Sequence, residues 1–183
     1  DMAEVFATYY EKLYAAGEPV SGDSLRQFLA QTALVWVDGA AREWPNAPLT
    51  LESVTGAIRA LASGKVPGGD GLPIEFYEHY IDLLAPRLLA VYSEAFKMGH
   101  LPPSCMEAHI VPLLKAGRGS LVCNSYRPLS MLNVDNKILA MLLAVRLQPM
   151  MPMLTYPEQA GFIPQRSTSH NICVLMAILQ RVD

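Results

Sequence analysis

Two stretches of this sequence carry residue types that could do chemistry. The first, residues 63–77, gathers glycines, prolines and a lysine, a composition typical of loops that cradle phosphate groups. A phosphate-binding loop of the Gly-x-x-x-x-Gly-Lys-[Ser/Thr] type would need glycine at 59 and serine or threonine at 66, where the chain has Arg59 and Val66. The P-loop interpretation therefore fails. We expect one compact bend, with Asp70 free to hydrogen-bond the bend or a partner.

The second stretch is the helix expected after this bend, where Glu75 and His79 fall four residues apart on one face. A zinc site on a helix would need a His-Glu-x-x-His pattern, and no second histidine stands here. Cys105, Cys123 and Cys173 are odd in number and far apart, which indicates neither a zinc site nor a disulfide framework. We expect a solvated helix face and three reduced thiols, with Cys173 in the core.

Composition narrows the class of protein. The 183 residues are 51% hydrophobic and 17% charged, and the net charge of −3 argues against a free-standing nucleic-acid binder. Residues 101–183 nevertheless hold seven basic and four acidic residues. No apolar run approaches the roughly 20 residues of a membrane span, and the start shows no secretory signal. We expect an intracellular protein, nuclear or cytoplasmic, without membrane contact.

The elements that must position these residues are mostly helices, so the predicted class is α+β, mostly helical. Helical spacing of apolar residues predicts helices over 2–15, 25–34, 51–61, 74–82, 83–98, 133–147 and 169–182. Pro86 is expected to begin a new helix, and Gly99 to follow its end. The expected N-caps are Thr50, Asn133 or Asp135, and Ser167 or Ser169. A strand at 108–114 and a return strand at 126–130 form a hairpin, and residues 38–50 and 150–157 are expected to be a linker and a loop.

Six segments stand in a specific order along the chain. They are GKVPGGDGLPIEFY at 64–77, LP at 101–102, IVPLLK at 110–115, NSYRPLSMLN at 124–133, KILA at 137–140 and QAGFIPQRS at 159–167. This series resembles the amino-terminal part of the reverse transcriptase of LINE-type non-LTR retrotransposons. There, GKxPGxDGxPxEFY, LPxxW, IPK, NYRPISLLN and QxGFxxGR follow one another. The resemblance runs from about Leu49 to the end, and residues 6–14 more loosely resemble the family's FxxYYxxLY helix.

Some positions depart from the family pattern. Cys105 stands where the family has tryptophan, and Leu114 and Ala116 flank Lys115 where prolines are usual. Gln165 replaces the glycine before Arg166. These departures concern loop geometry more than the overall fold.

The resemblance implies a fingers subdomain of a right-hand polymerase over residues 50–168, with a short antiparallel hairpin. A helical extension and linker over 1–49 would precede it, and a helix over 169–183 would lead toward the palm. By matching segment to segment, Lys115 and Arg127 on the hairpin strands would contact the phosphates of the incoming nucleotide, with Arg118 at the tip. The residues that would lie along the template are Pro128, Leu129, Ser130, Asn133 and Arg166.

The resemblance also implies that the metal-binding aspartates of the family lie beyond Asp183. We therefore expect no catalytic residue, metal ligand or cofactor in this chain, and no nucleotide incorporation by it alone. The full enzyme would use Mg²⁺, an RNA template, a DNA primer, deoxynucleotides and the remaining palm and thumb. The alternative is a truncated or co-opted, non-enzymatic interaction module.

Three further residues have expected roles. Phe162 is either a stacking platform for a template base or, as we favour here, an ordinary core residue. Lys137 and Arg146 are expected to face out of an apolar helix, either solvated or with their charged ends reaching water along its surface.

Overall fold

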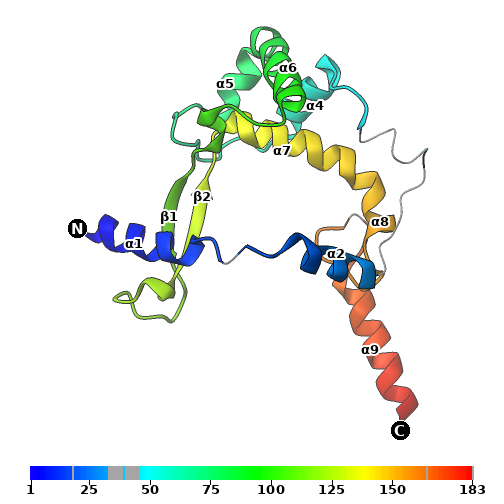
Figure 1. Cartoon of the computed structure of the whole chain (residues 1–183). Coiled ribbons are helices and arrows are strands. Elements are labelled where there is room, and N and C mark those ends of the chain that lie inside the picture. Colours follow the sequence, from blue (N-terminus) through cyan, green and yellow to red (C-terminus); the bar gives the residue numbers. More distant parts are fainter. Residues whose placement is uncertain (18, 33–38, 40–45, 164, 183) are drawn as a thin grey trace.

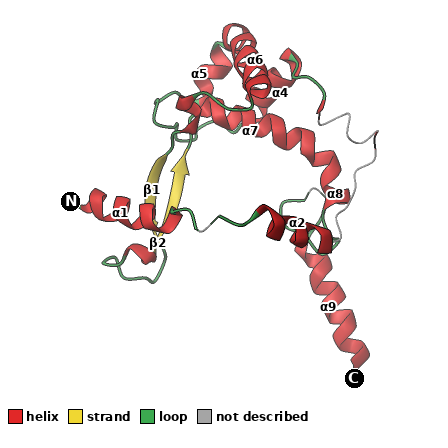
Figure 2. Ribbon diagram, in the orientation of Figure 1, coloured by secondary structure: helices red, strands yellow, loops and turns green. Residues whose placement is uncertain are grey.

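The computed structural model describes residues 1–17, 19–32, 39, 46–163 and 165–182 (Figure 1). The α-helices are α1 (Met2–Tyr14), α2 (Gly22–Gln31), α4 (Leu51–Ala60), α5 (Ile74–His79), α6 (Ile81–Met98), α7 (Val134–Leu147), α8 (Met151–Leu154) and α9 (Thr168–Val182). Three short 3-10 helices lie at Pro103–Met106, Cys123–Ser125 and Gln148–Met150. Within the described residues, the strands are β1 (His109–Leu114) and β2 (Tyr126–Met131). Figure 2 shows this helical chain with its single described hairpin, so the α+β, mostly helical class is confirmed.

The core lies where α4, α6 and α7 meet. Val54 and Ile58 are one turn apart on α4, and Ile138 and Leu142 are one turn apart on α7, so each helix presents one apolar stripe to the other. Tyr92 of α6 belongs to the same core cluster and is almost fully buried. Thr50 caps α4 as expected, accepting a hydrogen bond from the Ser53 backbone in a capping box.

Tyr80 separates α5 from α6. The expectation that Pro86 begins a helix is therefore wrong. Pro86 is the sixth residue of α6, inside the helix. Its ring removes the hydrogen bond that a backbone N–H would make to Asp82. Tertiary packing tolerates this loss because Ala85 and Tyr92 of the same helix are buried in the core. Gly99 ends α6 in the left-handed conformation, as expected.

The hairpin pairs β1 and β2 in antiparallel register, with Pro112 opposite Pro128. The Lys115 amide donates to the Ser125 carbonyl at 2.9 Å, so 115 and 125 form a hydrogen-bonded pair. Because such pairs alternate with non-hydrogen-bonded ones, the pair 112–128 is of the second kind. Neither proline therefore costs the ladder a hydrogen bond.

The carboxyl-terminal part of the chain departs most from the expectations. Residues 151–154 form the one-turn helix α8 rather than a loop. α9 runs away from the rest of the molecule, as Figure 1 shows, and its described side chains are intermediate or exposed. The expectation that Cys173 is a core residue is therefore wrong. Most of the expected linker 38–50 lies outside the described residues.

One described helical stretch, 134–154, is long and apolar enough to cross a membrane by length and composition. In this respect the expectation that no run approaches a membrane span is wrong. Ile138 and Leu142 of this stretch are buried against the other core helices, whereas Leu143, Val145 and Leu147 are exposed. The absence of membrane contact stays a prediction.

Candidate nucleic-acid interface on the hairpin

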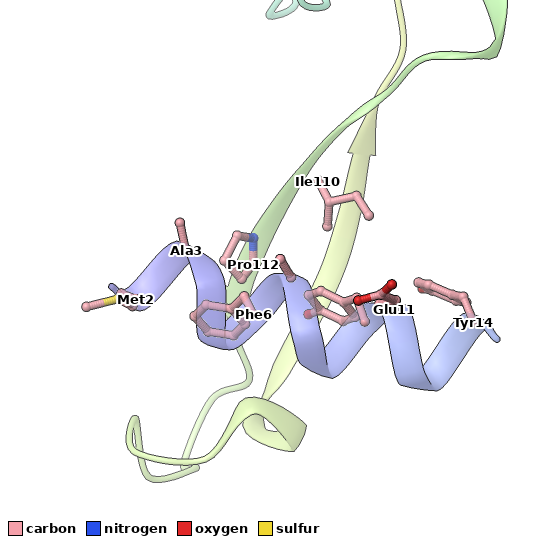
Figure 3. A pocket seen from close by; sticks show the side chains of 9 residues that line it. Met2, Ala3, Phe6, Glu11, Tyr14, Ile110 and Pro112 are labelled. Atoms are coloured by element: carbon pink, nitrogen blue, oxygen red, sulfur yellow. The ribbon is translucent and has the colours of Figure 1, made fainter.

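The helix α1 covers one face of the hairpin. The rings of Phe6 and Tyr126 meet edge to face, with centroids 4.9 Å apart. Beside this contact, Ile110 and Pro112 of β1 and Tyr10 of α1 line an apolar pocket of about 630 Å³ (Figure 3). Ile110, Pro112 and Tyr126 belong to one face of the hairpin because side chains of a strand alternate between faces.

The opposite face carries the two cations that the sequence assigned to phosphate contact. Arg127 is paired with Leu113, and Lys115 follows two residues later, so both side chains belong to the face that α1 leaves open. The Lys115 Nζ donates to the Asn124 carbonyl at 2.8 Å. Within the described ranges, the side chain of Arg127 makes no hydrogen bond or ion pair, and it is exposed.

The third predicted cation, Arg118, lies in the connection between the strands. Its backbone amide donates to the Lys115 carbonyl at 3.2 Å, and its side chain is exposed. Lys115, Arg118 and Arg127 therefore all lie near the end of the hairpin where the two strands are connected. Since the nearest described acidic residues in sequence are Glu107 and Asp135, no carboxylate lies within the segment 108–134 to neutralise them.

The predicted template residues are not brought to one face. Leu129 lies on the face of Arg127, whereas Pro128 and Ser130 belong to the face of α1. All three are exposed. Asn133 follows β2, and Arg166 belongs to the segment between α8 and α9. Figure 1 shows that segment well away from the hairpin. A template contact for these residues stays a prediction.

The glycine-rich bend is a structural joint between the hairpin and α7. Gly68 lies so close to Asn133 that a Cβ added to it would stand 2.6 Å from the Asn133 Cα. The Asn133 side-chain oxygen accepts from the Asp70 amide at 3.3 Å. Asn133 is thus at the N-cap position of α7, but its side chain bonds the bend and not the helix. A Cβ on Gly69 would meet the His109 imidazole at 2.9 Å.

Further hydrogen bonds close the bend. The Asp70 carboxylate accepts from the Leu72 amide at 3.0 Å, as expected for an aspartate that shapes its own turn. The Glu75 carboxylate accepts from the Gly64 amide at 2.6 Å, and this bond holds the pKa of Glu75 below its usual value. The Lys137 Nζ, at the surface, also donates to the Val66 carbonyl at 3.3 Å, a contact that the sequence did not predict.

The sequence of the chain is similar to proteins of mobile elements. No protein-family profile matches the chain. It is 33% identical over 172 residues, 94% of its length, to the "Transposon TX1 uncharacterized 149 kDa protein" of Xenopus laevis. It is 31% identical over 121 residues, 66% of its length, to the "RNA-directed DNA polymerase from mobile element jockey" of Drosophila funebris. The jockey polymerase of Drosophila melanogaster is 30% identical over 103 residues.

The chain is related to LINE-type retrotransposon reverse transcriptases. It spans 13% of the length of each of the first two relatives and 11% of the third. The resemblance seen in the sequence is confirmed at this level, as a relationship to part of a reverse transcriptase.

A polar cluster that the sequence did not predict lies where α6 and the segment before β1 meet the start of α7. The Tyr92 hydroxyl donates to the Asp135 carbonyl at 2.7 Å, and the Asn136 side chain donates to the Cys105 carbonyl at 2.7 Å. The Cys105 Sγ lies 3.9 Å from the Asp135 carboxylate. Burial, and then the neighbouring Asp135, raise the pKa of Cys105. A raised pKa disfavours the thiolate, which is the nucleophilic form, so this geometry indicates a structural role for Cys105. The cluster fixes the turn before β1 to α7.

Arg166 organises the loop that contains it. Its guanidinium donates to the carbonyls of Pro152, Tyr156 and Gln159, at 3.0, 2.6 and 3.1 Å, and to the Thr155 hydroxyl at 3.0 Å. Arg146 similarly donates to the Pro48 carbonyl at 2.8 Å, so it is not merely solvated.

Phe162 is not a core residue, contrary to the interpretation favoured from the sequence. Its side chain is fully exposed, and its backbone adopts a φ of 63°. The turn conformation beside Gly161 directs the ring to solvent, where an apolar residue type alone had indicated burial.

No metal centre is apparent in the part of the chain that the structure describes, where no group of three or more His, Cys, Asp or Glu side chains is arranged to hold an ion. Glu75 bonds the bend, and the His79 ring meets Tyr80 edge to face at 4.7 Å.

Proposed function

We propose that this chain is the fingers region of a reverse transcriptase, and that its hairpin contacts the phosphates of the incoming nucleotide and the template. The observation that supports this most is the convergence of Lys115 and Arg127 on the face that α1 leaves open. Guanidinium and ammonium groups are the side chains that proteins use for phosphate, and Arg127 has no described partner that would occupy it. The jockey relatives are RNA-directed DNA polymerases by name.

The full protein would extend a DNA primer on an RNA template with deoxynucleotides, in the nucleus or cytoplasm. Its chemistry would use Mg²⁺. The contribution of this chain would be binding: Lys115, Arg118 and Arg127 would hold phosphate, and the bend at 68–71 would set the hairpin against α7.

Binding of single-stranded RNA by the full chain tests the proposal. Anisotropy of a fluorescein-labelled 20-nucleotide RNA would be measured from 50 to 200 mM salt for the wild type, Arg127→Gln and the matched control Arg59→Gln on the exposed end of α4. If Arg127 holds a phosphate, Arg127→Gln weakens binding and lowers the salt slope by about 0.7. Equal slopes for Arg127→Gln and wild type, or no RNA binding by the wild type, would contradict the proposal.

A specific observation also favours the second function, a protein-interaction module. α9 exposes a nearly continuous apolar surface formed by Ile172, Val174, Leu175, Met176, Ile178 and Leu179. Such a surface normally marks a contact with another chain or domain. Sedimentation of the full chain tests this: concentration-dependent association that Leu175→Glu abolishes would favour the module, and a monomer at all concentrations would count against it.

A further inference from the structure

The loop between α8 and α9 exposes two aromatic rings. Phe162 is 107% exposed and Tyr156 is 76% exposed. Large aromatic side chains normally bury their rings, because each ring removes 150–250 Å² of surface from water. Two such rings in solvent on one loop are therefore candidates for a contact.

The loop is held in shape from inside. The Arg166 guanidinium ties the carbonyls of Pro152, Tyr156 and Gln159 together. Ile163, directly after Phe162, is buried, and the Arg166 amide donates to its carbonyl at 3.2 Å. The exposed ring of Phe162 is thus displayed by a loop with an internal anchor on its carboxyl side.

The backbone at Phe162 also favours exposure. A φ of 63° is an outlier for a bulky side chain and is usual for glycine or asparagine. A turn of this shape would form more easily with glycine, so phenylalanine here carries a conformational cost that no described packing contact of its ring offsets.

The electrostatic setting is compatible with a polyanion. Among residues 150–182, Glu158 is the single carboxylate, and Arg166, His170 and Arg181 are the basic residues. The guanidinium of Arg166 is already engaged by the loop, so stacking, and not charge, is the interaction that this loop has to offer.

We propose that Phe162, with Tyr156, is a stacking platform for unpaired bases of the single-stranded template. Every base has a π-face, so aromatic side chains bind single strands with little sequence preference. The inference rests on the proposed function, because it needs a nucleic-acid template. It adds a contact on the segment between α8 and α9, which lies away from the hairpin in Figure 1. It also assigns to Arg166 the role of a positioning residue for this loop.

The test uses the full chain and a 20-nucleotide uridine RNA that carries one 2-aminopurine, whose fluorescence falls when it stacks. Phe162→Leu keeps an apolar side chain and the same backbone strain but removes the ring, whereas Phe162→Tyr keeps the ring. We expect Phe162→Leu to weaken binding about fivefold or more and to reduce the quenching, and Phe162→Tyr to preserve both. Because the contact is not ionic, the loss should be the same at 50 and 200 mM salt.

The outcomes separate this inference from the proposed function. If the wild type and Phe162→Leu bind equally while Arg127→Gln binds more weakly, the stacking platform is refuted and the hairpin function stands. If the wild type binds no RNA, the proposed function itself fails. Because the Phe162 ring is fully exposed, the unfolding midpoint of Phe162→Leu should match the wild type, and a lowered midpoint would also contradict a solvent-facing platform.

Discussion

Replacing Gly68 with alanine should destabilise the protein more than any comparable change in the same bend. The new Cβ would stand 2.6 Å from the Asn133 Cα and nearer still to the Asn133 backbone nitrogen and side-chain oxygen. Backbone atoms cannot rotate away as the end of a side chain can, so the bend must separate from the start of α7. Overpacking of this kind costs about 1–3 kcal/mol.

The separation also breaks the hydrogen bond from the Asp70 amide to Asn133. A typical hydrogen bond contributes about 0.5–1.5 kcal/mol, so the two effects together lower the free energy of unfolding by about 1.5–4.5 kcal/mol. That is a large share of the stability of an ordinary domain, which is about 5–15 kcal/mol.

Two neighbouring glycines are matched controls. Gly71 has a φ of 74° and open space around a Cβ, so Gly71→Ala should cost about 1–2 kcal/mol from backbone strain alone. Gly69 meets only the end of the His109 side chain, which can turn aside, so Gly69→Ala should cost less than about 1 kcal/mol.

Urea unfolding followed by far-ultraviolet circular dichroism would give the order of the three midpoints. We expect Gly68→Ala to be the least stable, then Gly71→Ala, then Gly69→Ala. If Gly68→Ala unfolds at the same urea concentration as Gly69→Ala, the close approach of the bend to α7 is wrong.

Three other changes have outcomes that follow from the fold. Ile138→Ala removes a fully buried side chain and should lower the free energy of unfolding by about 2–5 kcal/mol, whereas Leu121→Ala, at a 98% exposed position, should change it little; equal midpoints in urea would contradict the core. Pro86→Ala restores a backbone donor inside α6 and should raise the thermal midpoint, while a fall would show that the proline is needed where it stands. Burial, and then the nearby Asp135, raise the pKa of Tyr77 to about 12, above its usual value of 10. The unfolded chain therefore loses this proton first, so stability should be fully present below pH 10 and should fall between pH 10 and about 12. In urea titrations Tyr77→Phe should reduce this fall, and an unchanged slope would place the Tyr77 hydroxyl in water.

The sequence predicted those elements whose signals are local. Thr50 and Gly99 mark helix ends by their own chemistry, and both are found where expected. The hairpin strands were found within one residue, because apolar runs separated by Gly117 and Gly119 form a local pattern. Arg127 lies on β2 as predicted, and Lys115 directly follows the last residue of β1.

Features that depend on distant parts of the chain were not predictable in this way. The Asn133 side chain leaves its own helix for Asp70, 63 residues earlier. Cys105 and Asp135 meet across 30 residues. Cys173 and Phe162 are apolar by type, and only the path of the backbone shows that neither lies in the core. The local sequence pattern indicates which conformation a residue favours, whereas contacts with distant segments determine its burial and its hydrogen-bond partners.

The opposed prolines of the hairpin also limit how copies of this chain can associate. The apolar residues on the strands, such as Val111 and Leu113, would otherwise favour the addition of a strand from another copy. Pro112 lies in the middle of β1 and Pro128 in the middle of β2, at positions where the backbone points away from the partner strand. Neither proline has an N–H that an incoming strand could bond. Growth of the two-stranded ribbon into a fibril-like stack is thereby blocked on both sides, and its exposed apolar side chains stay available for contacts made face-on.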